Sequence, residues 1–452
     1  MTFELGPRAP GPWGWRSPRA PVPTAAFRCE AAVNNIDLDR FGRPRVVVTG
    51  MGAVTPHGIG LAAAWAGVTE GRSAIGGITR FDPTGFPVRF GAEAGDPDLE
   101  DDRGWSIPES VAHLAFDLKG RLAVTAAREA LAMAGLPRLG ARAGVCLGSE
   151  AARPSLADVA RRLADSEPPD AATLARMRPD APTRLLAALV GATGPRSTVS
   201  TACTSSSQAV GEGVLRLRRG EVDAMVVGGV DVLVDPIMVT GFSLLGALST
   251  RNDDPQAASR PFDADRDGFV LGEGAGMLVL ETMASARARG ANVLGEIDGF
   301  GCSCNAYRIT DSPPDGRGAA QSMSAALADA GLNPEDVDYI NAHGTSTLMN
   351  DASETRGIHK AFGSHGGVVR VSSTKSMTGH LVAACGAVEA IYSLLACRDG
   401  VMPPTANLDR PDPECNLAHV SRTAERQKVR RAMTNAFGFG GSNGTLVVSA
   451  LA

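Results

Sequence analysis

Short hydrophobic runs alternate with longer stretches of helical periodicity from residue 45 to the end of this chain. Residues 45–50 predict a buried strand, because the run is short, apolar and closed by a glycine. The same patterns predict helices at 61–71, 119–134, 203–219 and 381–396, and strands at 143–148, 224–230, 277–280 and 337–342. Such alternation predicts the α/β class, with βα units built around a parallel sheet.

One part of this pattern occurs twice. Ala130-Leu-Ala-Met-Ala-Gly-Leu136 and Ala326-Leu-Ala-Asp-Ala-Gly-Leu332 each end a predicted helix and lead into a predicted strand. A solenoid needs three or more copies, so two copies predict a duplicated α/β domain instead. We therefore expect an N-terminal half over 45–294 and a C-terminal half over 295–452.

Residues 1–44 lack this periodicity and are punctuated by proline, which predicts a poorly ordered extension. They contain no apolar core of a signal peptide, and their arginines leave an organelle-targeting role open. No stretch approaches the roughly 18 consecutive apolar residues of a membrane span. The eight cysteines have no paired spacing, which is typical of reduced thiols and predicts a cytoplasmic location.

Composition and motif context argue against several kinds of ligand. The net charge of −5, with only 3 Tyr and 4 Trp, argues against a nucleic-acid partner. The glycines of 268–276 precede a predicted strand and do not open a helix, so they predict tight turns and not a nucleotide site. The histidines lack HExxH spacing and Cys302-Ser-Cys304 has no partner pair, so no metal site is predicted.

Cys203 is the first candidate for chemistry, because the pattern places it at the N-terminus of the predicted helix 203–219. The amide dipoles there favour the thiolate, which is the nucleophilic form of cysteine. Taken alone, such a cysteine is more often a buried structural one. His343 follows a predicted strand and His380 precedes a predicted helix, and each alone is more often a satisfied, partly buried histidine.

Four segments, taken together, favour a catalytic interpretation of these residues over a structural one. They are Thr201-Ala-Cys-Thr-Ser, Asn341-Ala-His-Gly-Thr-Ser-Thr, Ser373-Thr-Lys-Ser-Met-Thr-Gly-His and Phe437-Gly-Phe-Gly-Gly-Ser-Asn. In this order they resemble the β-ketoacyl-acyl-carrier-protein synthases, both the elongating enzymes of type II fatty-acid synthesis and the ketosynthases of type II polyketide synthesis. The resemblance runs from residue 45 to the end of the chain. It implies a thiolase-like fold, in which two duplicated βα halves form five α-β-α-β-α layers, and no cofactor.

The resemblance also implies a role for each motif. Cys203 accepts the growing acyl chain as a thioester, and malonyl-carrier protein then loses CO2 to give the enolate that attacks it. His343 and His380 donate hydrogen bonds to the enolate oxygen, and the N–H groups of Cys203 and Phe439 hold the thioester oxygen. The other implied residues are the cation Lys375 with its partner Glu389, the supporting Asp351 and Glu354, and the gate formed by Phe437 and Phe439.

The implied partners are an acyl carrier protein, which carries the acyl and malonyl groups on phosphopantetheine, and a second subunit that is either another copy or a chain-length-factor-like chain. Leu348 and the loop 148–153 depart from the usual motifs, and leave open the acyl chain length and the choice between a fatty-acid and a polyketide pathway. A non-condensing chain-length-factor-like subunit is the main alternative, although such subunits generally lack the nucleophile. A thiolase is disfavoured because 435–444 contains no second cysteine.

Overall fold

The computed structural model describes residues 36–99 and 106–451. Most of the predicted extension, residues 1–35, lies outside this range. From Asp37 onward the chain forms one structural unit. Residues 37–44, which the prediction placed in the extension, form a turn closed by a bridge between Leu38 and Pro44. The turn is fixed to the unit by Arg43, which forms ion pairs with Asp39 and Asp329.

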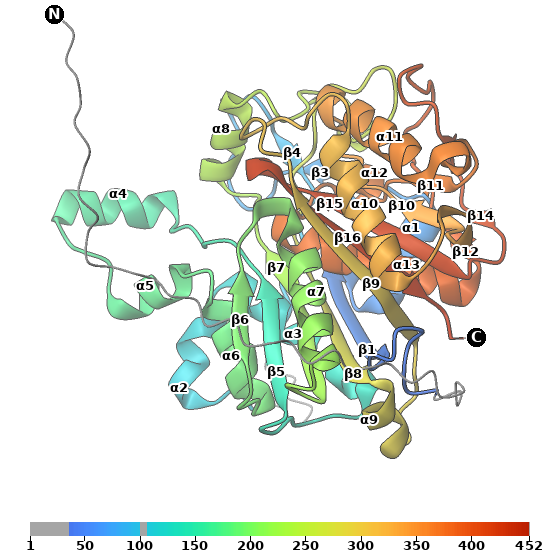
Figure 1. Cartoon of the computed structure of the whole chain (residues 1–452). Helices are drawn as coiled ribbons and strands as arrows, with labels where there is room; N and C mark the ends of the chain where they lie inside the picture. Colours follow the sequence, from blue (N-terminus) through green and yellow to red (C-terminus); the bar gives the residue numbers. More distant parts are fainter. Residues whose placement is uncertain (1–35, 100–105, 452) are drawn as a thin grey trace, which may run out of the picture. The chain divides into compact units, whose positions relative to one another are not determined.

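A 12-stranded sheet runs through the unit (Figure 1). The N-terminal half contributes β1 (Val46–Thr55), β2 (Gly58–Ile59), β5 (Ala143–Gly148), β6 (Arg196–Val199), β7 (Ala224–Asp231) and β8 (Gly274–Thr282). The C-terminal half contributes β9 (Gly295–Cys304), β10 (Tyr339–Asn341), β11 (Arg370–Ser372), β13 (Ala418–His419), β15 (Arg431–Phe437) and β16 (Ser442–Ser449). Apart from β2, which pairs with β1, the strand order is β13-β11-β10-β15-β16-β9-β1-β8-β7-β5-β6.

The two halves meet where β1 pairs with β9, through Val47 with Glu296 and Val48 with Gly295. The sheet is mixed, and this corrects the prediction of a purely parallel one. Strands β5, β6 and β7 are parallel, as are β10, β11, β13 and β15. The central strands β8, β1, β9 and β16 pair antiparallel. Strands β15 and β16 are antiparallel because only residues 438–441 connect them, and a turn of this length can join only antiparallel strands.

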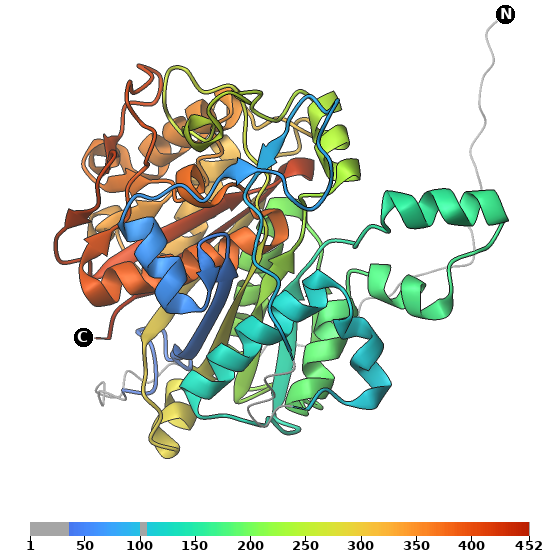
Figure 2. The ribbon, with the colours of Figure 1, turned by 180° about the vertical axis from the view of Figure 1, so that it is seen from behind.

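Helices form layers on both sides of the two half-sheets (Figures 1 and 2). The middle layer contains α7 (Ser205–Arg218) and α13 (Cys385–Asp399), which pack on each other and on strands of both halves. Helix α3 (Leu118–Ala134) covers the outer face of the first half, and α10 (Arg317–Ala330) with α11 (Leu348–Phe362) covers that of the second. This is the predicted five-layered arrangement.

Glycines let the outer helices approach the sheet closely, and they do so in the same way in each half. A Cβ at Gly52 of β1 would collide with the carbonyl oxygen of Ala126 in α3. A Cβ at Gly301 of β9 would collide with the carbonyl oxygen of Ser322 in α10. Helix α13, by contrast, is buried on every side from Cys385 to Cys397, as expected for a helix between two sheets.

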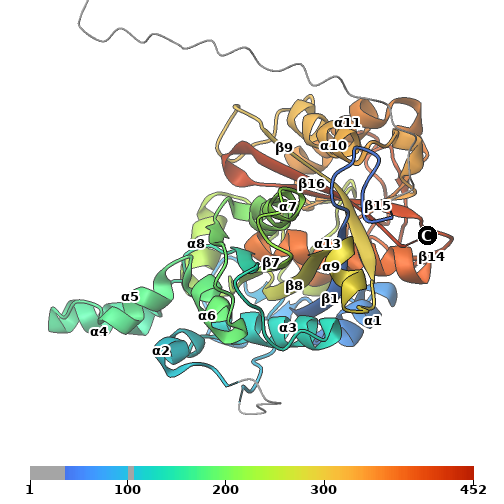
Figure 3. The same ribbon diagram turned by 60° about the horizontal axis from the view of Figure 1, so that its bottom comes forward.

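The remaining elements are short or peripheral. They are α1 (Leu61–Thr69), α2 (Glu109–Ala112), α6 (Ala181–Val190), α8 (Pro236–Leu244), α9 (Met283–Ala288), α12 (Lys375–Thr378), and the strand pairs β3 (Gly76–Gly77) with β4 (Phe90–Gly91) and β12 (Val401–Met402) with β14 (Glu425–Arg426). Helices α4 (Leu156–Asp165) and α5 (Ala171–Met177) project from the body as an arm (Figure 3). None of the described helices combines the length and apolar character needed to cross a bilayer.

Candidate active site

Cys203 lies in a tight turn between β6 and α7. A 3-10 segment, Ala202–Thr204, precedes the helix, so the predicted helix 203–219 begins as a tighter turn. Ala202 has a φ of 52°, a left-handed value that is uncommon for a residue with a Cβ. The turn places Cys203 at the helix N-terminus, as predicted, with only 7% of the residue exposed.

His380 reaches the sulfur from a turn of the same form in the C-terminal half. That turn runs through Val382–Ala384 into α13, and Val382 has a φ of 41°. His380 Nε2 lies 3.0 Å from Cys203 Sγ. The backbone N–H of Val382 donates to His380 Nδ1 over 3.3 Å. Because Nδ1 accepts this bond, Nε2 carries the ring proton and directs it at the sulfur.

His343 completes the group from the end of β10. Its ring centroid lies 5.3 Å from that of His380. The carboxylate of Glu354 accepts the backbone N–H groups of His343 and Gly344, each at 2.8 Å, and thereby fixes the turn that carries the ring. Burial, and then the charge of Lys375, hold the pKa of both histidines well below the ordinary value. Both imidazoles are therefore neutral, as the hydrogen-bonding role requires.

The protonation of Cys203 differs from the sequence-based expectation. Burial raises the pKa of the Cys203 thiol to about 12, although Lys375 and the backbone N–H groups of Phe439 and Cys203 act in the opposite direction. The expectation concerned the helix terminus alone, and the backbone N–H groups there do lower the pKa of the thiol. The net pKa is nevertheless raised, because the cost of desolvating a charged sulfur exceeds the stabilisation by the nearby dipoles and cation. The thiol is therefore protonated at neutral pH.

Lys375 and Glu389 form a buried ion pair beside this group, as expected. Burial raises the pKa of Glu389 to about 7. Burial alone would lower the pKa of Lys375, but the Glu389 carboxylate outweighs it and keeps the ammonium charged. The ligand atoms of Cys203, His343 and His380 lie within 4.8 Å of one another, a spacing also compatible with a metal ion. The Lys375 charge would repel such a cation, so we interpret the group as acid–base and hydrogen-bonding machinery.

A cavity of about 320 Å³ leads to the sulfur and both imidazoles. Phe437 and Phe439, the predicted gate, line it together with Leu348, whose side chain is exposed at the entrance. Gly438 between the two phenylalanines packs against the Cys203 turn, and a Cβ there would come within 2.9 Å of the Thr201 carbonyl oxygen. A glycine is therefore required at this close approach.

Two family models cover most of the chain. The model described as beta-ketoacyl synthase, N-terminal domain, matches residues 43–286, and the C-terminal domain model of the same family matches residues 294–409. The chain belongs to the β-ketoacyl synthase family. This confirms the family predicted from the four motifs.

Individual relatives agree with this assignment. This synthase is 43% identical over 409 residues to 3-oxoacyl-[acyl-carrier-protein] synthase 2 of Synechocystis sp. The aligned region covers 89% of this chain and 97% of that protein. The solved ishigamide ketosynthase/chain length factor is 35% identical with a TM-score of 0.82, covering 91% of this chain and 100% of that one. A structure of a type II polyketide synthase acyl-carrier protein in complex with its ketosynthase contains a chain that is 30% identical to this one, with a TM-score of 0.79. The match covers 91% of this chain and 100% of that one. The thiolase-like fold and the condensing-enzyme class are confirmed.

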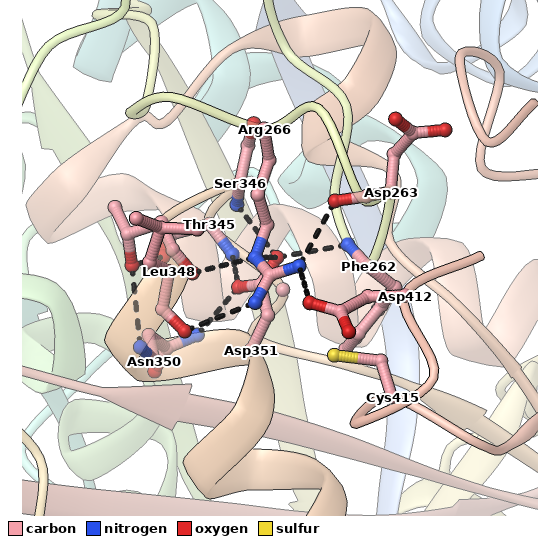
Figure 4. Close-up of polar contacts among 12 residues, drawn as sticks. Phe262, Asp263, Arg266, Thr345, Ser346, Leu348, Asn350, Asp351, Asp412 and Cys415 are labelled. Carbon is pink, nitrogen blue, oxygen red and sulfur yellow. Dashed lines mark hydrogen bonds and ion pairs between the residues drawn. The ribbon is translucent and has the colours of Figure 1, made fainter. Parts of the chain in front are cut away.

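The synthase holds the loop after His343 with a buried polar network (Figure 4). Asp351, for which the resemblance implies a supporting role, accepts the backbone N–H groups of Thr345 and Ser346 at 3.0 and 3.1 Å. Sequence analysis assigned no role to Arg266, which lies 3.7 Å from Asp351 and donates to Asp412 Oδ2 over 2.6 Å. Its only signal in the sequence is its place in the segment Arg260-Pro-Phe-Asp-Ala-Asp-Arg-Asp-Gly-Phe269, which lies within the range of the resemblance, from residue 45 to the end.

Arg266→Met should destabilise the synthase by about 3–5 kcal/mol, because it leaves the buried Asp351 carboxylate without its cation. The Arg266 side chain is 2% exposed and that of Asp351 is fully buried, so water does not replace the lost partner. Urea unfolding followed by circular dichroism measures the loss. The matched control is Arg308→Met, whose exposed pair with Asp311 contributes less than about 1 kcal/mol. Equal losses in the two variants would show that the Arg266 network does not carry stability.

Proposed function

We propose that this synthase elongates an acyl chain held on Cys203 by decarboxylative condensation with malonyl-carrier protein. The observation that carries the proposal is the 3.0 Å contact between His380 Nε2 and Cys203 Sγ, with His343 beside them in one cavity. A nucleophile and two neutral hydrogen-bond donors around one sulfur suit two successive reactions, acyl transfer and enolate formation.

Acyl transfer comes first. The Cys203 sulfur attacks the carbonyl carbon of the acyl thioester, the C–S bond to the carrier breaks, and the thiol proton passes to the departing carrier sulfur. The backbone N–H groups of Cys203 and Phe439 interact with the sulfur and lower its pKa, which supports a role for them in holding the oxyanion. Lys375 and the start of α7 stabilise negative charge as it develops on the sulfur, although they do not ionise the resting thiol.

Condensation follows on the acyl-enzyme. Malonyl thioester loses CO2, and the electron pair of the broken C–C bond moves to form an enolate oxygen. The Nε2–H of His380 and the ring of His343 stabilise that oxygen by hydrogen bonding. The enolate carbon then attacks the Cys203 thioester, a new C–C bond forms as the C–S bond to Cys203 breaks, and the released Cys203 sulfur takes up a proton from solvent. The product is a 3-oxoacyl chain on the carrier protein, two carbons longer than before.

The partners and organisation are part of the same proposal. Names of the relatives support an acyl carrier protein as the donor of both substrates. The ishigamide ketosynthase is solved with a chain length factor, which supports a second subunit here, either a copy of this chain or a related one. The two family-model matches support division into halves at 45–294 and 295–452. The seven described cysteines are free thiols, which supports a cytoplasmic location.

Intact-protein mass spectrometry tests the proposed function. The full chain is incubated with acyl-carrier proteins of different chain length, and peptide mapping should locate one acyl mass on Cys203. Addition of malonyl-carrier protein should then remove that mass and release 3-oxoacyl-carrier protein. The acyl lengths that load distinguish fatty-acid from polyketide substrates. Failure of every acyl-carrier protein to load Cys203 would instead support a non-condensing partner subunit.

A further inference from the structure

Glu150 lies at the end of β5 and reaches across to the turn that carries Cys203. Its Oε1 accepts the backbone N–H of Ala202 over 2.9 Å and the hydroxyl of Ser205 over 3.0 Å. Its Oε2 accepts the hydroxyl of Ser200 over 2.7 Å. One half-buried carboxylate therefore binds the chain on both sides of Cys203, in the loop 148–153 that departs from the usual family motif.

The Cys203 turn needs such an external anchor. Ala202 adopts a left-handed φ of 52°, which costs a residue with a Cβ about 1–3 kcal/mol and persists only where the surroundings hold it. Its N–H group also stands at the start of the 3-10 turn that leads into α7, where backbone donors have no partner within the helix. The hydrogen bond from the Ala202 N–H group to the Glu150 carboxylate therefore does two things: it gives that group a partner, and it fixes the strained backbone at Ala202.

The backbone of Glu150 is itself fixed by a buried cation that also connects to the His380 turn. Lys119 Nζ, from α3, donates to the Glu150 carbonyl oxygen over 2.6 Å and pairs with Asp231 at 3.2 Å. Asp231 Oδ2 accepts the backbone N–H of Ala383 over 3.4 Å, in the turn that follows His380. Glu150, Lys119 and Asp231 thus connect the turn of the sulfur to the turn of the imidazole.

We propose that Glu150 is a positioning residue that, through the Lys119–Asp231 pair, holds the Cys203 turn in register with the His380 turn. This inference rests on the proposed roles of Cys203 and His380. It does not place Glu150 in contact with substrate. Misplacement of a reacting group by about 1 Å costs on the order of a hundredfold in rate, so loss of the anchor has a measurable consequence.

The Glu150 charge gives a second readout. The charged and titratable groups that act on the Cys203 sulfur are Lys375, His343, His380, Cys385 and Glu150. Of these, Glu150 is a carboxylate whose charge raises the pKa of the thiol. Gln at this position keeps an acceptor oxygen for Ala202 and Ser205 and removes the charge. Ala removes both the acceptor and the charge, so the two variants separate anchoring from electrostatics.

The experiment compares Glu150→Ala, Glu150→Gln and the matched control Glu129→Ala. Glu129 is also a half-buried carboxylate that accepts two backbone N–H groups, those of Ala53 and Leu61, but it lies outside the Cys203 turn. We expect Glu150→Ala to lower kcat for condensation about 10- to 100-fold with KM for the carrier proteins within twofold. Glu150→Gln should retain kcat within about threefold, and Glu129→Ala should retain it while losing as much thermal stability as Glu150→Ala.

The pH dependence of Cys203 alkylation by iodoacetamide is measured on the same proteins. We expect the midpoint to shift to lower pH in Glu150→Gln and to stay at the wild-type value in Glu129→Ala. A kcat for Glu150→Ala within twofold of wild type, or an equal loss of kcat in Glu129→Ala, would overturn the positioning role of Glu150. Coincident alkylation midpoints for Glu150→Gln and wild type would overturn the effect of the Glu150 charge on the thiol. Alkylation requires neither carrier protein nor condensation, so it tests that charge effect even where the wild-type chain fails to condense.

Discussion

Cys203→Ala forms no acyl-enzyme and loses condensation by at least about a thousandfold, because the variant has no nucleophile to carry the acyl chain between the two reactions. The measurement is acyl mass on the protein together with release of 3-oxoacyl-carrier protein. Cys203→Gln should behave differently. Its side-chain carbonyl occupies the place of the thioester carbonyl, so malonyl decarboxylation continues at His343 and His380 while condensation stops.

The control for this experiment is Cys304→Ala, which removes an exposed free thiol outside the described cavity lining. It should load and condense like the wild type. Acyl loading that persists in Cys203→Ala at the wild-type rate would assign the nucleophile to another residue. Peptide mapping of that product would identify it. The thiol to compare is that of the buried Cys385, which donates to the Cys203 carbonyl oxygen over 3.2 Å.

The sequence was sufficient to predict the duplicated fold and the residues that converge on the cavity. The repeated Ala-Gly-Leu helix ends predicted two similar halves because each marks a helix that packs on glycines of a strand, as at Gly52 and Gly301. The motif residues could be predicted because each motif follows a strand or opens a helix, and such ends gather at one place in α/β proteins. The Lys375–Glu389 pair, which the resemblance implied, also agrees with the cost of a buried unpaired charge.

What could not be predicted depends on contacts between distant segments. The protonation of Cys203 is set by the burial of its thiol among segments from distant parts of the chain, including those of His380 and Phe439, and the local helix pattern does not encode that burial. Glu150 accepts a backbone N–H group and Arg266 donates to a backbone carbonyl oxygen, each far away in the chain, and a backbone group carries no residue-type signal. The antiparallel join between β1 and β9 likewise depends on how the halves meet, not on either strand alone.

His380→Ala should lower malonyl decarboxylation about 100- to 1,000-fold and leave acyl transfer to Cys203 within about tenfold of wild type. Only decarboxylation develops charge on an enolate oxygen, and removing one donor to such an oxygen costs on the order of 10²–10³ in rate. The Val382 N–H bond to Nδ1 supports this division, because it leaves Nε2 as a donor. Acyl loading is followed by mass spectrometry and decarboxylation by release of labelled CO2.

Two further variants make the division of labour decisive. His380→Asn keeps an N–H donor on a shorter side chain and should recover part of the decarboxylation rate. The control is His365→Ala, which should change neither step, because His365 contacts the Val337 carbonyl outside the cavity lining. Equal loss of acyl transfer and decarboxylation in His380→Ala would mean that Nε2 accepts the Cys203 proton in the first reaction. In that case the imidazole would serve as the base for a thiol that burial keeps protonated, and the enolate would depend on His343 alone.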